Sequence, residues 1–351
     1  MKNIPKNAKI LLIKLRSIGD VVYNTAVYSP IKRCFPDTHL TVVVDRPSYD
    51  LVCDHPDVDE VLCFEKEFLW KQVKFYARLI FSRYDVAIDM HEGPRGAVMC
   101  FLTRAPIRIG NKFAKRSFLY NTKLNFSDLK PKFPIDYQVA LIKKMGVHFD
   151  HVEPSIYISE SARHRARDLL TENGIQSGYQ YCVIHPGTKK IYDQWQYEKF
   201  SRLAEIIPKK YKIKVVLTCG PDEVPQIKNI IRLSKGSPVP YIQTRLQEVS
   251  AVTQGATFVL CHNGGYMHLA SALGTPVIAL FGVVHPEIWK PLGEKDQVIY
   301  KNIECSPCYK HTRKLECYEG DAECKRVIEV EDVLEAIEKI LSKNDPRKNI
   351  M

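Results

Sequence analysis

Residues 9–20 of the chain read KILLIKLRSIGD, and the rest of the sequence repeats the pattern that they set. The apolar run over 9–15 has the length and composition of a buried strand. Gly19 and Asp20 then follow a tight turn and open a helix that we expect to run to about Arg33. A strand, a turn and a helix in this order build a parallel sheet covered by helices, so the stretch predicts an α/β fold.

The same alternation continues along the chain and restarts after its middle. Further strands are expected at 40–44, 61–64, 84–89, 181–185, 214–218, 258–261 and 277–281. Helices are expected at 66–82, 161–173, 196–207 and 330–341. A chain of 351 residues exceeds an ordinary domain, and a Pro-containing stretch at 151–160 separates the two runs. We therefore predict domains at 1–155 and 156–327 and a terminal segment at 328–351.

The composition favours a soluble protein with an anionic partner. No stretch approaches the roughly 18 uncharged apolar residues of a membrane helix, and Lys14 makes the first apolar run too short for a signal peptide. We therefore expect a cytoplasmic protein. Its net charge of +11 is typical of proteins that meet nucleic acid, an anionic membrane or a phosphorylated substrate, and charge alone does not choose among these.

Asp20 is the first candidate functional residue. Ligands of open parallel sheets bind at the carboxyl ends of the strands, and Asp20 follows such an end. An aspartate at a helix start also stabilises the helix by accepting backbone N–H bonds, and the spacing leaves both interpretations open. The dinucleotide fingerprint GxGxxG is absent here, which argues against a dehydrogenase.

A glycine-rich turn at 261–268, CHNGGYMH, lies between a strand and a helix. Two glycines before a helix let the backbone approach a ligand, and the N–H groups at the helix start favour an anion such as a pyrophosphate. Glycines that merely ease a strand-to-helix turn are the alternative. His268 alone is more typical of a packed or capping residue than of a ligand.

Two further loops follow expected strands in the second half. The loop at 185–190, HPGTKK, offers a hydroxyl and ammonium groups to phosphate oxygens, or it is simply solvated. The loop at 220–223, GPDE, offers Asp222 and Glu223 to a ribose diol, or it stabilises a helix start.

Four of the eleven cysteines cluster late in the chain. Their spacing is compatible with a structural zinc site of four thiolates, although the second pair is not CxxC. Thiols without a metal, or a redox-sensitive cluster, are the alternative. The residues concerned are Cys305, Cys308, Cys317 and Cys324.

Taken together and in order, these motifs resemble glycosyltransferase family nine, the ADP-heptose:lipopolysaccharide heptosyltransferases. The resemblance runs from ILLIKLRSIGDVV through HPGTKK and CGPDE to HNGGYMHLASALGTPVIALFG, and the CSPC cluster has related forms in many relatives. It implies the GT-B architecture, with two Rossmann-like domains, an acceptor-binding N-terminal half and a donor-binding C-terminal half. It also implies that segment 328–351 forms a helix returning to the first domain, with a frayed tail.

The resemblance assigns roles to individual residues. Asp20 takes the position of the catalytic aspartate, a general base in an inverting transfer that requires no cofactor or metal. The nucleotide sugar is then bound by the second half, with Asp222 as an alternative to Glu223 on the ribose. The donor-binding residues are Thr188, Lys189, Lys190, Glu223, Asn263, Gly264, Gly265, Tyr266 and His268.

The chain departs from the family at two positions. Asn263 replaces a common aspartate, and Asp193 stands where the phosphate-binding lysine usually lies, so Lys189 or Lys190 is the hypothetical substitute. The implied acceptor, the anionic lipopolysaccharide core at the cytoplasmic face of the inner membrane, agrees with the basic charge. We therefore expect a cytoplasmic protein that associates peripherally, and in a salt-sensitive way, with the surface of that membrane. Four basic residues are candidates for binding the acceptor, although each could simply be a solvated side chain. They are Arg95, Arg108, Lys112 and Arg116.

Three other functions compete with this one. The same fold would serve another nucleotide sugar, and a non-catalytic paralogue would only bind a nucleotide or a core sugar. A zinc-dependent nucleic-acid-binding protein would use the charge and the cysteines, but it leaves the two α/β halves unexplained. The chain also lacks a basic helix or an aromatic RNA platform, so we expect no nucleic-acid partner.

Overall fold

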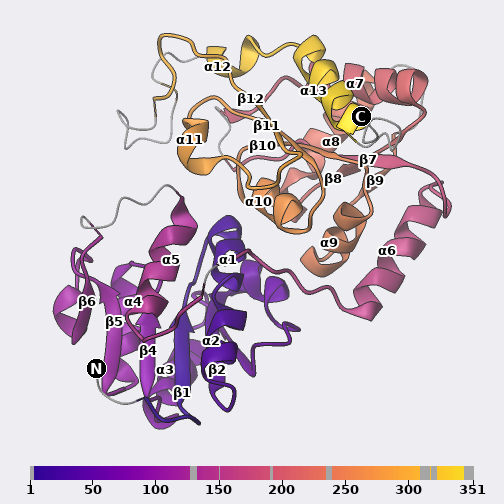
Figure 1. The fold of residues 1–351 in the computed structure, drawn as a ribbon. Coiled ribbons are helices and arrows are strands. Elements are labelled where there is room, and N and C mark those ends of the chain that lie inside the picture. The colour runs from indigo at the N-terminus through magenta and orange to yellow at the C-terminus, as the bar shows by residue number, and fades with distance from the viewer. Residues whose placement is uncertain are drawn as a thin grey trace, which may run out of the picture. The chain divides into compact units, whose positions relative to one another are not determined.

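The computed structural model describes residues 4–126, 133–149, 151–189, 193–234, 239–308, 317 and 322–343. The chain divides into two compact units, Met1–Tyr157 and Ile158–Met351, so the division lies next to the predicted boundary. Each unit contains one parallel sheet of six strands (Figure 1).

The sheet of the first unit has the strand order β3-β2-β1-β4-β5-β6, and all its neighbouring strands are parallel. In this order the strands are β3 (Glu60–Phe64), β2 (His39–Asp45), β1 (Lys9–Ile13), β4 (Val86–Asp89), β5 (Ile107–Asn111) and β6 (Thr122–Leu124). The helical segments are α1 (Ile18–Thr25), α2 (Tyr28–Cys34), η1 (Arg46–Leu51), α3 (Leu69–Phe81), α4 (Pro94–Leu102), η2 (Ser117–Leu119) and α5 (Pro134–Lys143).

The sheet of the second unit has the order β12-β11-β10-β7-β8-β9, again with parallel neighbours. Its strands are β12 (Gln297–Ile299), β11 (Val277–Leu280), β10 (Val259–His262), β7 (Tyr181–His185), β8 (Lys214–Thr218) and β9 (Tyr241–Ile242). The helical segments are α6 (Glu160–Glu172), α7 (Tyr197–Tyr211), η5 (Pro221–Glu223), α8 (Val224–Leu233), α9 (Leu246–Gln254), α10 (Gly265–Ala272), α11 (Pro286–Trp289), α12 (Glu323–Arg326) and α13 (Val330–Lys343).

The two sheets share one topology. In both, the first strand lies in the middle, the second and third extend to one side, and the fourth to sixth extend to the other. The strand order therefore reverses between β1 and β4 in the first unit and between β7 and β10 in the second. Such a reversal is where open α/β sheets bind ligands, outside the carboxyl ends of the strands.

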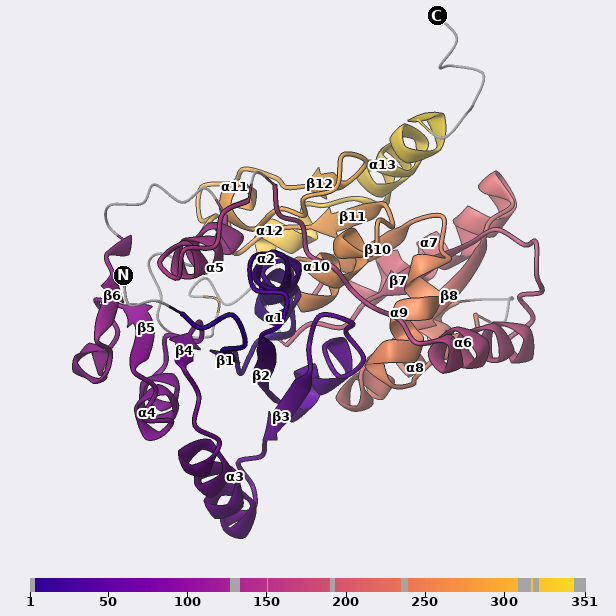
Figure 2. The same ribbon diagram turned by 60° about the horizontal axis from the view of Figure 1, so that its bottom comes forward.

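Alternation along the strands builds the core on both faces of each sheet. In β7, Cys182 and Ile184 pack on the side of α7, α8 and α13, whereas Tyr181 and Val183 pack on the side of α6, α9 and α10. This is the period-two pattern of a strand that is buried on both faces. Figure 2 shows the same ribbons from another side.

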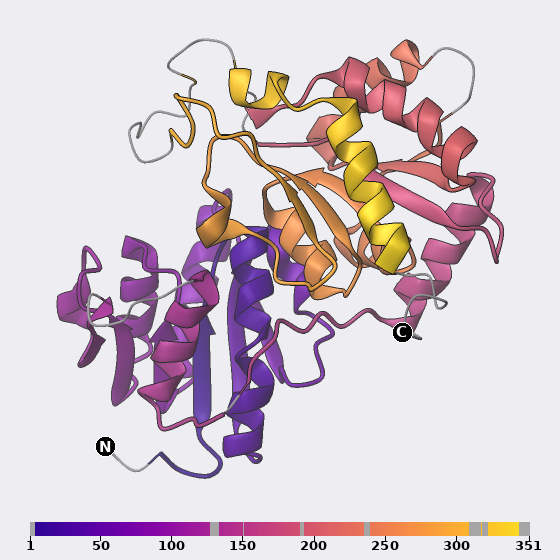
Figure 3. The ribbon, with the colours of Figure 1, turned by 45° about the horizontal axis from the view of Figure 1, so that its top comes forward.

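The terminal helix α13 packs on the second unit, where it contacts α7, β11 and β12 (Figure 3). Its apolar side chains Val333, Ile337 and Ile340 are fully buried in the same core as β7. The expected return of segment 328–351 to the first domain stays a prediction. Residues 344–351, where the frayed tail was expected, lie outside the described part.

The helix predicted from Gly19 to Arg33 is two helices, α1 and α2. The interruption at Ala26 and Val27 precedes Pro30, which lacks an N–H group and whose ring clashes with the carbonyl four residues earlier. That carbonyl belongs to Ala26, so a continuous helix is disfavoured here. Among the helices that the structure describes, none has the length and apolar character needed to cross a bilayer.

Candidate functional site

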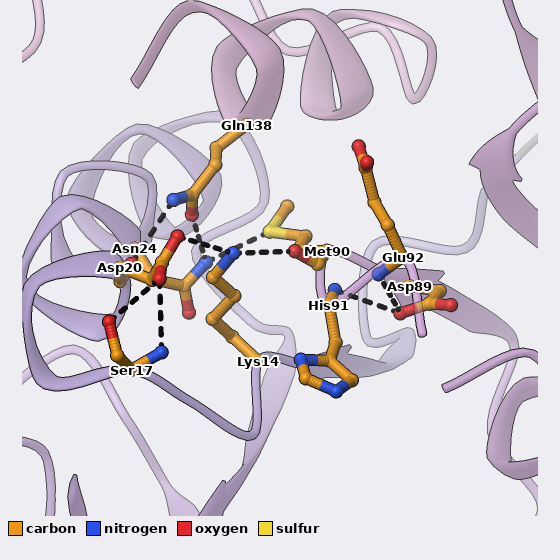
Figure 4. Close-up of polar contacts among 9 residues, drawn as sticks. All are labelled: Lys14, Ser17, Asp20, Asn24, Asp89, Met90, His91, Glu92 and Gln138. Atoms are coloured by element: carbon orange, nitrogen blue, oxygen red, sulfur yellow. Dashed lines mark hydrogen bonds and ion pairs between the residues drawn. The ribbon is translucent and has the colours of Figure 1, made fainter. Parts of the chain in front are cut away.

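Asp20 lies at the sheet reversal of the first unit, in the first turn of α1. Its Oδ2 accepts hydrogen bonds from the Ser17 backbone N–H at 3.0 Å and the Ser17 hydroxyl at 2.9 Å (Figure 4). The N-cap of α1 is Ser17, and Asp20, three residues later, completes a capping box, so Asp20 stabilises the helix start without being the N-cap itself. The Asp20 carboxylate remains accessible to a substrate, because the side chain is 32% exposed.

Lys14 controls the charge of Asp20. Its Nζ lies 3.1 Å from Asp20 Oδ1 and donates to the Met90 carbonyl at 2.9 Å, so it bridges the ends of β1 and β4. Burial is the largest single influence on Asp20 and raises its pKa. The Lys14 ammonium and the Ser17 hydrogen bonds together outweigh burial, so the pKa of Asp20 lies below its ordinary value.

A second network holds the start of α1 from behind. Gln138 of α5 donates to the Asp20 carbonyl at 3.2 Å and accepts from Asn24 at 2.6 Å. Asn24 in turn accepts from the buried Tyr28 hydroxyl at 2.8 Å. Because both amides are fully or almost fully buried, the network fixes the backbone of the turn that carries Asp20.

The loop after β4 is shaped by a buried carboxyl group. Asp89 accepts from the N–H groups of His91 and Glu92 and from the Tyr120 hydroxyl at 2.6 Å. Burial raises the pKa of Asp89 to about 6, against the effect of these hydrogen bonds. Burial, with the cations Lys14 and Arg16, lowers the pKa of His91 to about 4. A neutral imidazole therefore stands beside Lys14 at this edge.

The four predicted acceptor ligands lie on consecutive elements of the first unit. Arg95 is exposed in the first turn of α4, and Lys112 and Arg116 are exposed after β5. Arg116 donates to the Pro94 carbonyl at 3.4 Å, which brings it to the start of α4. Arg108 donates to the carbonyls of Leu119 and Ala105, so its guanidinium has a structural role in holding this loop.

The glycine-rich turn of the second unit lies at the other sheet reversal, where β10 ends and α10 begins. Gly264 is the N-cap of α10, and a side chain there would meet no protein atom within 4 Å. The turn thus leaves open space beside the first N–H groups of the helix, where an anion is stabilised. His268 N–H bonds back to the Gly264 carbonyl at 3.3 Å, and its side chain is buried.

Tyr266 contributes its backbone to this turn, because its side chain points elsewhere. Its hydroxyl bonds to Thr253 at 2.5 Å and lies 3.4 Å from Thr218, and its ring stacks on His185 at 4.0 Å between centroids. The stack links the end of β7 to the first turn of α10. The phenol is therefore part of the support of the site.

Glu223 is held at the end of β8. Its Oε2 accepts from the Gly220 N–H at 2.7 Å, and His185 Nε2 lies 3.6 Å away. A Cβ on Gly187 would come within 2.2 Å of the Glu223 carboxyl carbon, so only glycine allows this approach. Asp222 is exposed, which distinguishes the two carboxylates that the sequence left as alternatives.

Asp193, which stands where the family has a phosphate-binding lysine, is buried in an ion pair. Its Oδ1 lies 3.1 Å from Lys325 Nζ, and both side chains are 1% exposed. Lys325 also donates to the Leu280 carbonyl at 2.6 Å. With its amide nitrogen turned towards Asp193, Asn263 donates to Oδ2 at 2.7 Å, so its side chain joins this internal network.

The remaining members of the phosphate loop are only partly described. Thr188 is half-buried and Lys189 is exposed after β7, whereas Lys190 lies outside the described residues. The loop is fixed at its other end, because the Trp195 N–H donates to buried His262 Nε2 at 2.9 Å. Of the two candidate lysines, Lys189 is the one that the structure describes, and its side chain is exposed and accessible to a phosphate.

The late cysteines do not form a recognisable metal centre in the described chain. Cys308 and Cys324 pack with Val283 in a small apolar cluster. Within the described ranges, which omit 309–316 and 318–321, no three or more His, Cys, Asp or Glu side chains are placed to hold a metal ion. Zinc binding by Cys305, Cys308, Cys317 and Cys324 therefore stays a prediction, and no step proposed below uses it.

Several of these partners were missed in the sequence. In the sequence Lys14 only interrupts an apolar run, and Gln138 belongs to no motif, so neither pattern indicates a partner of Asp20. Lys325 gave no usable signal, because the stretch 321–329, DAECKRVIE, is mostly charged and predicts an exposed lysine. Its partner Asp193 had been noted only as a departure from the family.

Comparisons with known proteins identify the family of the chain. Residues 73–319 match the family described as glycosyltransferase family 9 (heptosyltransferase). The chain is 23% identical over 346 residues to lipopolysaccharide heptosyltransferase 3 of Escherichia coli K12. The match covers 95% of this chain and 98% of that protein.

Two solved structures extend the similarity to the fold. A family 9 glycosyl transferase from Veillonella parvula has a TM-score of 0.81 and 21% identity, and the match covers 96% of this chain and 97% of that one. An E. coli heptosyltransferase with ADP-2-deoxy-2-fluoro heptose has a TM-score of 0.70 and 20% identity, over 94% and 99% of the chains. The predicted GT-B fold with two Rossmann-like domains is confirmed.

Proposed function

The chain belongs to glycosyltransferase family 9, the heptosyltransferases, and from this membership we propose that it transfers a heptose from ADP-heptose to the inner core of lipopolysaccharide. The observation that carries the proposal is the placement of the two candidate sites. Asp20 in one unit and the Gly264–Gly265 turn in the other both lie where the strand order reverses.

The second unit would hold the nucleotide sugar. The N–H groups at the start of α10 suit the diphosphate, with Lys189 and Thr188 of the neighbouring loop adding donors. Glu223 suits the ribose hydroxyls. One of the similar solved structures holds an ADP-heptose analogue, which supports ADP as the nucleotide.

In the reaction that we propose, Asp20 removes the proton from the acceptor hydroxyl. The acceptor oxygen forms a bond to the anomeric carbon while the bond from that carbon to the phosphate oxygen breaks, so the configuration inverts. The acidity of the hydroxyl rises as its bond forms, so a carboxylate of low pKa suffices as the base. The helix start and its neighbouring cations stabilise the charge on departing ADP without a metal ion.

Nucleotide binding tests the donor assignment. Calorimetry of the purified protein with ADP, UDP, GDP and CDP, without added metal, is expected to show selective binding of ADP. Selective binding of another nucleotide would leave the fold assignment intact and change the donor sugar nucleotide. Asp193 and Asn263, which depart from the family pattern, make this a defined alternative. Binding of none of the four would favour a non-catalytic or unrelated function.

Replacing Lys14 by methionine is expected to move the acid limb of the kcat/KM profile to higher pH. The base acts when deprotonated, and the pKa of Asp20 is now held below its ordinary 3.8. Without the Lys14 ammonium, less opposes the effect of burial, so the pKa of Asp20 rises. As the pH falls, Asp20 is then protonated, and activity lost, at a higher pH than in the parent chain. Lys14→Arg, which keeps the charge, is the control. An unchanged limb in Lys14→Met would disprove the coupling.

Replacing Glu223 by glutamine is expected to weaken ADP binding about tenfold, because an amide accepts hydrogen bonds from ribose less strongly than a carboxylate. Calorimetry at constant pH measures the change. Asp222→Asn, on the exposed neighbouring residue, is the control and should alter the affinity less than about twofold. A loss confined to Asp222→Asn would exchange the two roles.

A further inference from the structure

Helix α3 of the first unit exposes an apolar face to solvent. Leu69, Trp70 and Val73 are 76%, 62% and 64% exposed, and Phe81 at the last turn is 80% exposed. Phe68, just before the helix, is 45% exposed. Single exposed apolar residues are ordinary, but several on one short helix mark an interaction surface.

The exposed face is not the face that holds the helix in place. Phe75 and Leu79 are buried in the core of the first unit, and they lie on the opposite side of α3. Successive side chains of a helix are rotated by about 100°, so Leu69, Val73 and Trp70 form a continuous stripe. Phe81 lies next to Trp70 around the helix axis and widens the stripe on that side. The helix thus has two apolar faces, and the fold uses only one.

Basic side chains border the exposed stripe. Residues 65–83 contain five lysine and arginine residues and two glutamates. Lys71 Nζ lies 4.7 Å from the centre of the Phe68 ring and 5.8 Å from that of Trp70, and it pairs with Glu65 at 2.5 Å. Lys74 and Arg78 are exposed along the next side, and Arg78 pairs with Glu60. An apolar stripe flanked by cations complements an anionic lipid surface, where acyl chains lie below negative headgroups.

The surface begins at the edge that carries Asp20. α3 follows the carboxyl end of β3, and Lys66 in the connecting loop is close enough to lower the pKa of His91, with burial the larger cause. Helix α4 packs beside α3 in the same unit (Figure 2). An acceptor sugar attached to a lipid would have its lipid anchor in the same bilayer surface.

We propose that α3 is a membrane-docking helix, which inserts Leu69, Trp70 and Val73 into the headgroup region of an anionic bilayer while Lys71 and Lys74 bind the headgroups. The surface itself is independent of the reaction. Its use in bringing the protein to a lipid-linked acceptor rests on the proposed function.

Vesicle binding by the full chain tests the docking helix. The protein should float with vesicles of phosphatidylethanolamine and phosphatidylglycerol, and less with vesicles of phosphatidylcholine. Leu69→Gln/Trp70→Gln/Val73→Gln should lower the partition by about tenfold or more, because the affinity of interfacial helices follows their buried apolar area. Ile288→Gln, at a residue of the second unit that is 46% exposed, is the matched control and should bind like the parent chain.

Tryptophan fluorescence localises the contact. The chain has three tryptophans, and Trp195 is fully buried. Vesicles should shift the emission to shorter wavelength in the parent chain, and Trp70→Phe should remove that shift. Equal vesicle binding by the triple variant and the parent chain would overturn the proposal, as would binding without a Trp70 signal. A triple variant that changes only self-association would assign the face to a second copy of the chain.

Transfer assays separate this proposal from the proposed function. With a delipidated, water-soluble acceptor, the triple variant should keep the activity of the parent chain, and only transfer to vesicle-bound acceptor should fall. Vesicle binding through Trp70 in a protein without transferase activity would support the docking helix and contradict the proposed function.

Discussion

Replacing Asp20 by asparagine is expected to lower the rate of sugar transfer by about a thousandfold, because a positioned general base contributes roughly 10²–10⁴ to the rate. The amide keeps the size of the side chain and can still accept from Ser17, so α1 should remain capped. ADP affinity should be unchanged, because the nucleotide contacts are assigned to the second unit. Single-turnover transfer and calorimetry measure the two quantities.

Asp332 provides a matched control for this substitution. It accepts from the N–H three residues earlier, that of Glu329, at 2.9 Å, and pairs with Lys301 at 2.7 Å. Asp20 has the same kind of partners in Ser17 and Lys14. Asp332→Asn should therefore cause a similar small loss of stability, of about 1 kcal/mol, without affecting transfer. If both variants retained similar rates, Asp20 would be a cap and not a base.

Replacing Lys325 by methionine is expected to destabilise the second unit by about 3–5 kcal/mol, because it leaves the buried Asp193 carboxylate without its cation. The Leu280 carbonyl loses the lysine as a donor and keeps the Asn263 N–H, at 3.1 Å. Denaturant unfolding, followed with a probe in the second unit, measures the loss. The double variant Lys325→Met/Asp193→Asn should recover part of it, because no unpaired charge then remains buried.

An exposed ion pair serves as the control for Lys325. Lys339 and Glu335 pair at 2.7 Å on α13, with side chains 57% and 66% exposed. Lys339→Met should cost less than about 1 kcal/mol, because water screens the pair. Equal effects of Lys325→Met and Lys339→Met would mean that the Asp193 pair is not needed to hold the phosphate loop.

Much of the fold was predictable because it depends on local apolar runs. The strands at 181–185 and 214–218 have the predicted bounds, since each is a β-rich run closed by loop residues. The C-terminal end of α7 was not predictable in the same way. The helix was expected to end before Pro208, but it continues to Tyr211, where Lys210 and Tyr211 bond to Glu338 of α13.

The candidate site shows the same division. Asp20, Gly264 and Glu223 could be predicted as site residues because strand ends, glycine pairs and carboxylates at helix starts leave a local pattern. The partners that determine their chemistry come from distant segments. The Lys14 bond to the Met90 carbonyl and the Asp193–Lys325 pair exist only because the sheet brings those segments together. Reading Asp193 alone showed a departure from the family but not its buried partner.

The most direct test of the proposed function is a transfer assay with the purified protein, ADP-heptose and a lipopolysaccharide core acceptor, followed by mass spectrometry of the acceptor. We predict an acceptor heavier by one heptose, formed with release of one ADP, and formation of that product about a thousandfold more slowly with Asp20→Asn. An unmodified acceptor, in the presence of a chain that is folded and binds ADP, would contradict the assignment as a heptosyltransferase of the lipopolysaccharide core.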